Sequence, residues 1–288
     1  MQKHKLSTMS TSKLEVLIDF GSDPDQKLIN STLAELKTTS GIKEVVYKDG
    51  AFMIETCLPS SVVLEEISRT SGRRAVLQGF GDTQSAVAMV SGHNQTIMGV
   101  VRLLQTEDTF VADGCIDGLP PHSTHGLHVH DAGDLSEGCS SIGGHYNPLG
   151  TPHGGPSNPT DARHAGDLGN IVTDGNGRAT FRIVDNVLKV WDVIGRSIAI
   201  SEKEDDLGKG TSPTSKLDGD SGKPIACGII ARSAGIFQNP KRICACDGVV
   251  VWDERDRPLA GKGRRVAEHK CCQNGTDKFK EAKRCCKF

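Results

Sequence analysis

The sequence is poor in long apolar runs, in aromatic residues and in net charge. None of its apolar stretches approaches the roughly 18 residues that a membrane-spanning helix requires, aromatic side chains make up 4% of the 288 residues, and the net charge is −2. We therefore expect neither nucleic acid nor a membrane span. Residues 1–12 have no apolar core, which favours a disordered leader over a secretory signal. A cytoplasmic protein is expected, and a fraction in the mitochondrial intermembrane space is compatible with this.

Glycine and cysteine, in contrast, are abundant, with 33 and 10 residues. Many glycines and few aromatics favour tight turns and an all-β portion. Ten cysteines without a secretory signal favour metal binding or redox chemistry over an extracellular disulfide framework. Four are dispersed and six crowd the C-terminus: Cys57, Cys115, Cys139 and Cys227, then Cys244, Cys246, Cys271, Cys272, Cys285 and Cys286.

Residues 13–81 alternate strand-like and helix-like patterns in the order βαββαβ, which is the ferredoxin-like arrangement. Asp23 followed by Pro24 predicts the start of the first helix. Asp49-Gly50, between two apolar runs, predicts a hairpin. We therefore expect an α+β domain over 13–81.

The pattern changes after a short linker. Residues 85–236 show short apolar runs broken by Gly, Asn, Asp and Pro, which predicts an antiparallel barrel or sandwich with a long polar loop over 131–170. Residues 237–288 are charged and rich in cysteine, with too few apolar residues for a core of their own. A multidomain chain with an irregular C-terminal tail is the expected architecture.

Seven of the ten histidines fall between His122 and His164. On a strand, His128 and His130 project to the same face. The long loop can bring three imidazoles and a carboxylate together, and such a set fills a closed tetrahedral zinc shell; the candidates are His145, His153, His164 and Asp167. The alternative is a group of exposed loop histidines.

These motifs resemble the copper/zinc superoxide dismutase family over about residues 85–236. The resemblance rests on Gly-Gly-His145-Tyr-Asn-Pro, His153-Gly-Gly-Pro, Arg-His164-Ala-Gly-Asp167 and Ala226-Cys227-Gly. It implies an eight-stranded Greek-key barrel in which His145 bridges copper and zinc. It further implies that His153, His164 and Asp167 complete the zinc site, that His128 and His130 remain from the copper site, and that Cys139 pairs with Cys227. Two reduced thiols are the alternative to that bridge.

Two departures from this family bear on activity. Ser201 stands where the family has its fourth copper histidine, and Pro224 stands where it has the arginine that guides superoxide. A neutral hydroxyl is a poor copper ligand beside imidazole. The sequence therefore predicts a zinc-binding barrel that does not dismutate superoxide. The alternative is an active copper/zinc dismutase with fused flanking segments.

Beyond the barrel, Cys244 and Cys246 are one residue apart, a spacing that suits copper(I). A disulfide between them would be strained and prone to exchange. The alternative is that the two cysteines are a redox-inert pair on the surface. The segment is similar to the C-terminal part of the copper chaperones for superoxide dismutase. That resemblance implies a protein that forms a heterodimer with immature dismutase through its barrel, delivers copper(I) and promotes the client's intrasubunit disulfide.

Other partners remain open. A homodimer is compatible with the sequence, and a purely structural, zinc-stabilised heterodimer partner is a third alternative.

The family usually carries Met-X-Cys-X-X-Cys before its first helix, but Ser22 and Asp25 stand in place of these cysteines. The hard oxygen ligands of serine and aspartate disfavour copper(I). We thus expect a structural or docking role for the first domain, and the identity of a copper importer stays open.

The last stretch, 270–288, falls outside both resemblances. It contains four cysteines among basic residues: Cys271, Cys272, Cys285 and Cys286. Metal ligation, lipid modification with membrane contact and a disordered tail are the interpretations, and nothing in the sequence supports membrane contact over the others.

Overall fold

The computed structural model describes residues 10–18, 25–81, 84–106, 108–233 and 235. Most of the expected leader, Ser22, and the whole tail with Cys244 and Cys246 lie outside the described residues. Among the residues that are described, no helix has the length and apolar character to cross a membrane.

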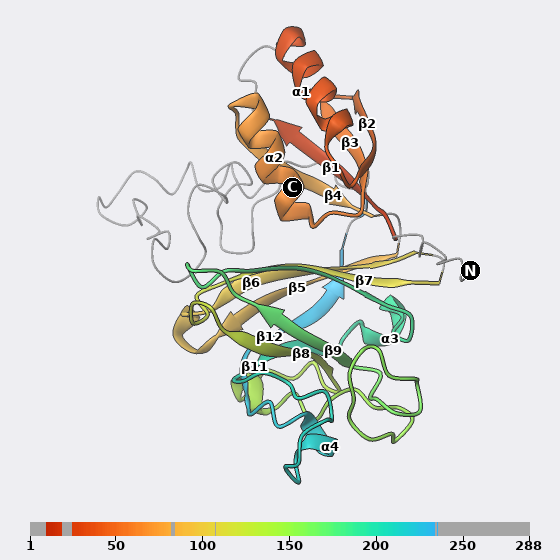
Figure 1. The fold of residues 1–288 in the computed structure, drawn as a ribbon, viewed down its shortest axis with the longest axis vertical. Helices are drawn as coiled ribbons and strands as arrows, with labels where there is room; N and C mark the ends of the chain where they lie inside the picture. The colour runs from red at the N-terminus through yellow and green to blue at the C-terminus, as the bar shows by residue number, and fades with distance from the viewer. Residues whose placement is uncertain (1–9, 19–24, 82–83, 107, 234, 236–288) are drawn as a thin grey trace, which may run out of the picture.

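The N-terminal domain is a four-stranded antiparallel sheet covered by two helices on one face (Figure 1). The order of its strands is β2-β3-β1-β4, which confirms the ferredoxin-like prediction. Alternate residues of β1, such as Leu14 and Val16, are fully buried against apolar side chains of both helices. The elements are β1 (Ser12–Ile18), α1 (Gln26–Thr38), β2 (Ile42–Lys48), β3 (Ala51–Thr56), α2 (Ser60–Ser71) and β4 (Ala75–Phe80).

Helix α1 begins later than the sequence predicts. Asp25, not Asp23, is the N-cap, and its carboxylate accepts hydrogen bonds from the backbone N–H groups of Lys27 and Leu28 at 2.9 and 3.1 Å. An aspartate that satisfies two otherwise unpaired amides fixes the start of a helix. The prediction from Asp23-Pro24 was wrong by two residues because a second aspartate follows the proline.

The second domain is an antiparallel sheet of eight strands in the order β10-β7-β6-β5-β12-β11-β8-β9. A backbone bridge between Thr173 and Ala179 links the two outer strands, so the sheet curls into a nearly closed barrel. This confirms the predicted barrel. Its strands are β5 (Ser85–Gly92), β6 (Met98–Gln105), β7 (Phe110–Asp117), β8 (Thr124–His130), β9 (Asp167–Val172), β10 (Ala179–Asp185), β11 (Ser197–Ser201) and β12 (Pro224–Arg232).

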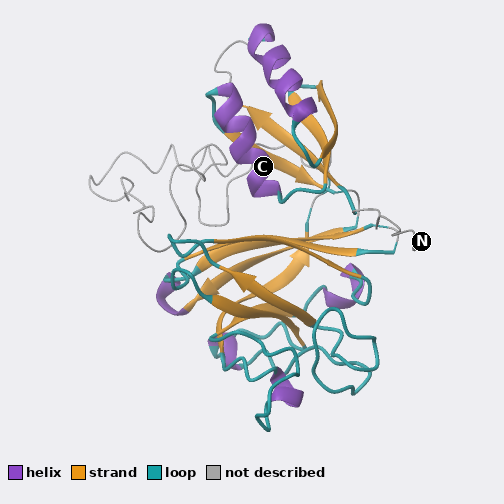
Figure 2. Ribbon diagram, viewed as in Figure 1, coloured by secondary structure: helices purple, strands orange, loops and turns teal. Residues whose placement is uncertain are grey.

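The barrel loops carry four short helices: η1 (His93–Gln95), η2 (Gly138–Ser140), α3 (Val190–Val193) and α4 (Ser215–Asp218). Figure 2 shows that the longest loops gather on the side of the barrel away from the N-terminal domain. The histidines therefore lie among long loops whose backbone must be fixed by other contacts.

The N-terminal domain sits on the outer face of β6 and β7 (Figure 1). Leu104 and Val111 of the barrel belong to the apolar core of the N-terminal domain. Between the domains, the carboxylate of buried Asp113 accepts from the backbone N–H and the hydroxyl of Ser60 at 2.8 and 2.5 Å. Arg182 approaches the same carboxylate at 3.5 Å and donates to the hydroxyl of Ser12. The two domains thus share a buried, hydrogen-bonded seam.

Candidate metal centre

Three parts of the chain converge on the histidine cluster. Strand β8 ends with His128 and His130, and the long loop that follows brings His145, His153 and His164 back toward it. His130 forms a backbone bridge with His145, and His128 lies opposite Asp167 in the β8–β9 pair. The alternation along β8 and the return of the loop together create one buried group of imidazoles, instead of the exposed loop histidines that were the alternative.

On one side of the group, three imidazoles face the carboxylate of Asp167. The Nδ1 atoms of His145 and His164 lie 2.9 and 3.3 Å from its Oδ1, and Nδ1 of His153 lies 3.1 Å from its Oδ2. The backbone N–H groups of Gly154 and His164 donate to Oδ2, which fixes the carboxylate. We call His145, His153, His164 and Asp167 the zinc-side set.

The zinc-side set fits a metal ion. Nδ1 of His153 and Nδ1 of His164 are buried without a hydrogen-bond partner. Buried ring nitrogens without a hydrogen bond are costly, and a cation bound between three nitrogens and one oxygen would give each of them a partner. Both nitrogens belong to the same set, whose three imidazoles and one carboxylate match the N₃O shell that zinc prefers.

Proximity alone would select a different quartet. Ligand atoms of His128, His145, His153 and Asp167 all lie within 4.8 Å of one another. His128 is near because its ring stacks on that of His145, with centroids 3.8 Å apart. Its Nε2, however, lies 3.0 Å from Oδ2 of Asp205, whereas Nδ1 of His164 has no partner. Hydrogen bonding therefore favours His164 over His128 as the fourth metal ligand, beside His145, His153 and Asp167.

The electrostatics favour neutral imidazoles at two of these histidines, a charged imidazole at a third, and a charged carboxylate. Burial lowers the pKa of His130 and of His145 to about 4, and the neighbouring imidazoles add to the effect. Burial also opposes protonation of His153, but its contacts with Asp167 and Asp205 outweigh this and raise its pKa to about 9. Burial disfavours the charge of Asp167, yet its close contacts with the imidazoles of His145, His153 and His164 hold its pKa well below the usual range. The carboxylate is thus charged, and a bound metal would displace the proton on His153.

Asp205 joins the two sides of the cluster. Its Oδ2 lies 3.0 Å from Nε2 of His128 and its Oδ1 lies 2.8 Å from Nε2 of His153. Its backbone is held by two hydrogen bonds with the side chain of Asn170. The sequence motifs did not point to Asp205. Its role could have been inferred from chemistry, because a metal-binding histidine commonly donates its second N–H to a carboxylate.

Gly219 leaves room for this bridge. Its φ is +70°, and a Cβ there would lie 1.9 Å from Oδ1 of Asp205 and 2.6 Å from Nε2 of His153. A side chain at 219 would be strained and would also displace the carboxylate.

Arg163 fixes the zinc-side loop from within. It is 1% exposed, and its guanidinium pairs with Asp185 of β10 at 2.6 Å. It also donates to the backbone carbonyls of His164 and Ala165. A buried charge is tolerated only with such partners. Sequence reasoning missed this role because an arginine between loop residues is usually exposed.

The other side of the cluster contains the two departures from the dismutase pattern. Ser201 ends β11, and its partner in the β11–β12 pair is Pro224. Ser201 is 2% exposed, and its hydroxyl oxygen lies 3.3 Å from Nδ1 of His128. His130 donates from Nδ1 to the carbonyl of Gly143, and its Nε2 is buried without a partner. We call His128, His130 and His145 the copper-side set; within it Nε2 of His130 is buried without a hydrogen bond, and Ser201 stands where a fourth imidazole would be.

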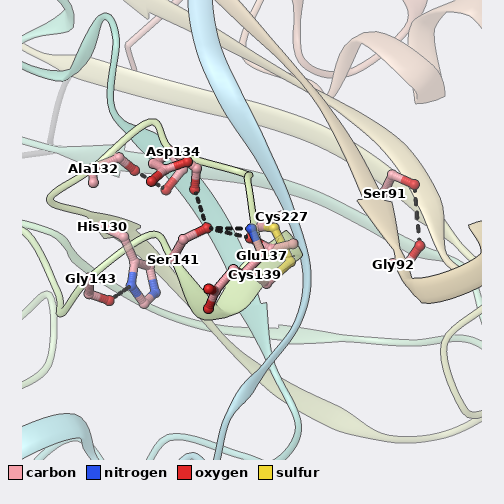
Figure 3. Close-up of a disulfide and its surroundings, with 12 residues drawn as sticks. Ser91, Gly92, His130, Ala132, Asp134, Glu137, Cys139, Ser141, Gly143 and Cys227 are labelled. Atoms are coloured by element: carbon pink, nitrogen blue, oxygen red, sulfur yellow. Dashed lines mark hydrogen bonds between the residues drawn. A yellow bond between two sulfur atoms is a disulfide. The ribbon is translucent and has the colours of Figure 1, made fainter.

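A disulfide fastens the loop to the barrel. Cys139 of η2 and Cys227 of β12 are joined across 88 residues, with Cα atoms 5.8 Å apart, which is the pairing that the resemblance implies. Figure 3 shows the bridge beside Ser141, whose hydroxyl donates to the carbonyl of Asp134, and beside the His130–Gly143 hydrogen bond. Closing a loop of this length contributes about 4–5 kcal/mol in the chain-entropy model.

The remaining predicted residues differ in what the structure can say of them. Asp25 uses its carboxylate to cap α1. Ser22, Cys244, Cys246 and the four tail cysteines lie outside the described residues. The geometry of the metal centre therefore concerns the barrel alone.

Comparison with known proteins agrees with this architecture. The family model "Copper/zinc superoxide dismutase (SODC)" matches residues 97–230. The copper chaperone for superoxide dismutase of Rattus norvegicus is 51% identical over 248 residues, which cover 83% of this chain and 89% of that protein. The Homo sapiens protein of the same name is 50% identical with the same coverage. The superoxide dismutase [Cu-Zn] of Paramecium bursaria Chlorella virus 1 is 42% identical over 51% of this chain and 77% of its own length. The chain therefore belongs to the family of copper chaperones for superoxide dismutase.

Proposed function

We propose that this protein delivers copper(I) to immature copper/zinc superoxide dismutase and promotes the client's intrasubunit disulfide, while its own barrel binds zinc and does not dismutate superoxide. The observation that carries the proposal is the unequal metal centre. The zinc-side set is a closed N₃O group, whereas Ser201 and Pro224 stand together on the copper side. The names of the relatives supply the client.

Zinc would be held by His145, His153, His164 and Asp167, where it would tie the long loop to β9. The two unpartnered Nδ1 atoms support this assignment. Such an ion needs no open coordination position, so its role would be structural. Asp205 and Arg163 would orient the set, the first by accepting from His153 and the second by holding the backbone of His164.

Dismutation is not expected, because copper would have three histidines at most and no charged side chain at position 224 to attract the superoxide anion. The rival function is an active dismutase. A dismutase assay on copper- and zinc-loaded protein separates the two, and turnover comparable to that of a copper/zinc dismutase would restore the rival.

The client would dock on an exposed apolar face beside the disulfide. Ile229 of β12 lies opposite Met89 of β5, given that the pairs Cys227–Ser91 and Ile230–Ala88 flank them, and both side chains are about two-fifths exposed. Leu135, in the disulfide-linked loop, is exposed to a similar degree. Neighbouring exposed apolar side chains, such as Ile229 and Met89, can mark a protein interface. We assign the immature dismutase to this face, and a second copy of this chain is the competing occupant.

Ile229→Glu tests the docking face, because a charge there would be buried without a partner on association. Val172→Glu is a matched control, since Val172 is exposed on β9 and lies outside this face. Sedimentation of the protein with metal-free dismutase should show a heterodimer for the control and separate species for Ile229→Glu. Association that survives Ile229→Glu would remove the face from the proposal.

The Cys244–Cys246 pair would act in two oxidation states. As thiolates the two sulfurs would hold copper(I) and pass it on by ligand exchange. As a disulfide the pair would be attacked by one client thiolate, giving a mixed disulfide that the second client thiolate resolves. The client is then oxidised by two electrons, and Cys244 and Cys246 are left as the reduced dithiol.

The decisive experiment is reconstitution of reduced, metal-free dismutase. Cys244→Ser with Cys246→Ser should abolish copper transfer and disulfide formation, and the zinc-bound barrel should stay folded. Truncation after Arg265 is the control for the tail cysteines and should retain both actions. Loss of both actions on truncation would transfer the role to the tail.

The first domain needs a subtler variant than deletion. Removing residues 1–81 would expose Leu104 and Val111, which pack in the core of that domain. Asp25→Asn retains an oxygen acceptor for the α1 cap but removes the carboxylate that stands in place of the family's second cysteine. Copper transfer should be unchanged, and a clear loss would show that this loop carries metal after all.

A further inference from the structure

Ser201 does more than leave a ligand position empty. It is a buried residue at the end of β11, and its hydroxyl is 3.3 Å from Nδ1 of His128. Its backbone carbonyl lies 2.9 Å from Nδ1 of His125, which anchors this end of the strand. The hydroxyl is thus directed at one particular imidazole nitrogen.

The tautomer of His128 is fixed from its other side. Nε2 lies 3.0 Å from the carboxylate of Asp205, and an ionised carboxylate only accepts hydrogen bonds. Nε2 therefore carries the proton, and Nδ1 carries the lone pair. The lone pair is the group that a metal would need, so the Ser201 hydroxyl is the donor in its contact with Nδ1.

The other two copper-side histidines differ from His128. His130 donates from Nδ1 to the carbonyl of Gly143, and its Nε2 is buried and unpartnered. His145 has Nδ1 2.9 Å from Asp167, on the zinc side. Of the three imidazoles, His128 is the one whose lone pair is occupied by a protein hydroxyl.

The geometry assigns Ser201 as a metal-selectivity residue that caps the lone pair of His128 and so disfavours copper in a barrel that still binds zinc. This inference deepens the proposed function, because a chaperone that retained copper in its own barrel would compete with its client. It rests on the proposed zinc-side set. A serine that merely lacked an imidazole would be equivalent to alanine, whereas a serine that caps His128 would not.

The test compares copper affinities in full-length chains in which the six C-terminal cysteines and the two free cysteines, Cys57 and Cys115, are serine, so that thiols do not compete. Each protein receives one equivalent of zinc and is then titrated with Cu²⁺ against a competing chelator. A net hydrogen bond corresponds to a factor of about 2–10 in an equilibrium constant. Ser201→Ala should therefore bind copper about 2–10 times more tightly than the serine form, with a stronger visible absorption band.

Ser197→Ala is the matched control, since Ser197 is a buried serine of the same strand whose hydroxyl donates to the carbonyl of Ala132. It should leave copper affinity unchanged. Equal affinity of the Ser201→Ala and parent proteins, or weaker binding by Ser201→Ala, would overturn the inference, the second result by showing that the hydroxyl is itself a ligand.

A measurement on the parent protein keeps the inference testable if Ser201→Ala does not fold. The ¹⁵N shifts of a histidine report which nitrogen is protonated and whether the other accepts a hydrogen bond. With zinc bound, His128 should show a protonated Nε2 and a hydrogen-bonded Nδ1. A free Nδ1 lone pair would overturn the inference, whereas failure of the proposed function would appear separately, as copper delivery without Cys244 and Cys246.

Discussion

The zinc side and the copper side of the cluster share His145, but only the zinc side has a full set of four candidate ligands. On the zinc side, three imidazoles surround Asp167, and two of their nitrogens are buried without partners. On the copper side, His128 already accepts a hydrogen bond from Ser201. Both sides are oriented by the same outer residue, because Asp205 contacts His128 and His153. One outer carboxylate therefore contacts both sides of the cluster, whereas only the zinc side has a complete set of candidate ligands.

Asp167→Asn should have the largest effect on this difference, because it removes the carboxylate on which the zinc-side set converges. Zinc at about 1,000 times its Kd stabilises a folded protein by about 4 kcal/mol. The variant should lose that stabilisation and melt in zinc at about the temperature at which the parent melts in chelator. Calorimetry with zinc analysis measures both.

The control for Asp167→Asn is Asp174→Asn. Asp174 lies in an exposed turn, where its Oδ1 accepts from two backbone N–H groups that an asparagine oxygen can also accept. It should keep the full response to zinc. An equal zinc response in Asp167→Asn would remove Asp167 from the proposed ligands.

Asp205→Asn should have an intermediate effect, because it alters the outer partner of His153 without removing a ligand. Losing such a partner typically costs 10- to 100-fold in metal affinity. We expect zinc affinity to fall by about that factor while stoichiometry stays at one. A chelator competition assay measures it, and affinity within a factor of two of the parent would mean that the loop, not Asp205, orients His153.

Ser201→His combined with Pro224→Arg should make the copper side more like the zinc side by adding a ligand to it. The pair restores the fourth imidazole and the positive charge at positions that face each other in the β11–β12 pair. We expect tighter copper binding and measurable dismutation in this variant, and no dismutation in the parent. An assay that finds no gain, in a protein that does hold copper, would place the defect elsewhere in the pocket.

Asp113→Asn should have the smallest effect on either metal. It weakens the seam between the domains, where one carboxylate serves Ser60 and Arg182, and should cost about 1–3 kcal/mol of stability. Zinc and copper titrations should be unchanged, because the seam lies on the outer face of β7. A change in zinc affinity would show that the N-terminal domain and the metal centre are coupled.

The fold and much of the candidate site could be predicted from the sequence. Strand alternation and Asp49-Gly50 indicated the first domain, and dense histidine spacing with family motifs indicated the barrel and its ligands. The N-cap was misplaced because an aspartate is a good cap at either position, and the hydrogen bonds that Asp25 accepts from Lys27 and Leu28 cannot be read from the sequence. Asp205 and Arg163 were missed because they act through contacts between residues distant in sequence. The seam formed by Asp113 was also beyond prediction, since it depends on how two separately predicted domains pack.

The most direct test of the account is metal analysis of the full-length protein in which the six C-terminal cysteines are serine. After loading with excess zinc and copper and brief exposure to a moderate chelator, native mass spectrometry counts the ions on each chain. The account predicts one zinc and no copper. One zinc and one copper that both survive the chelator would contradict it, because the copper side would then be as complete as the zinc side.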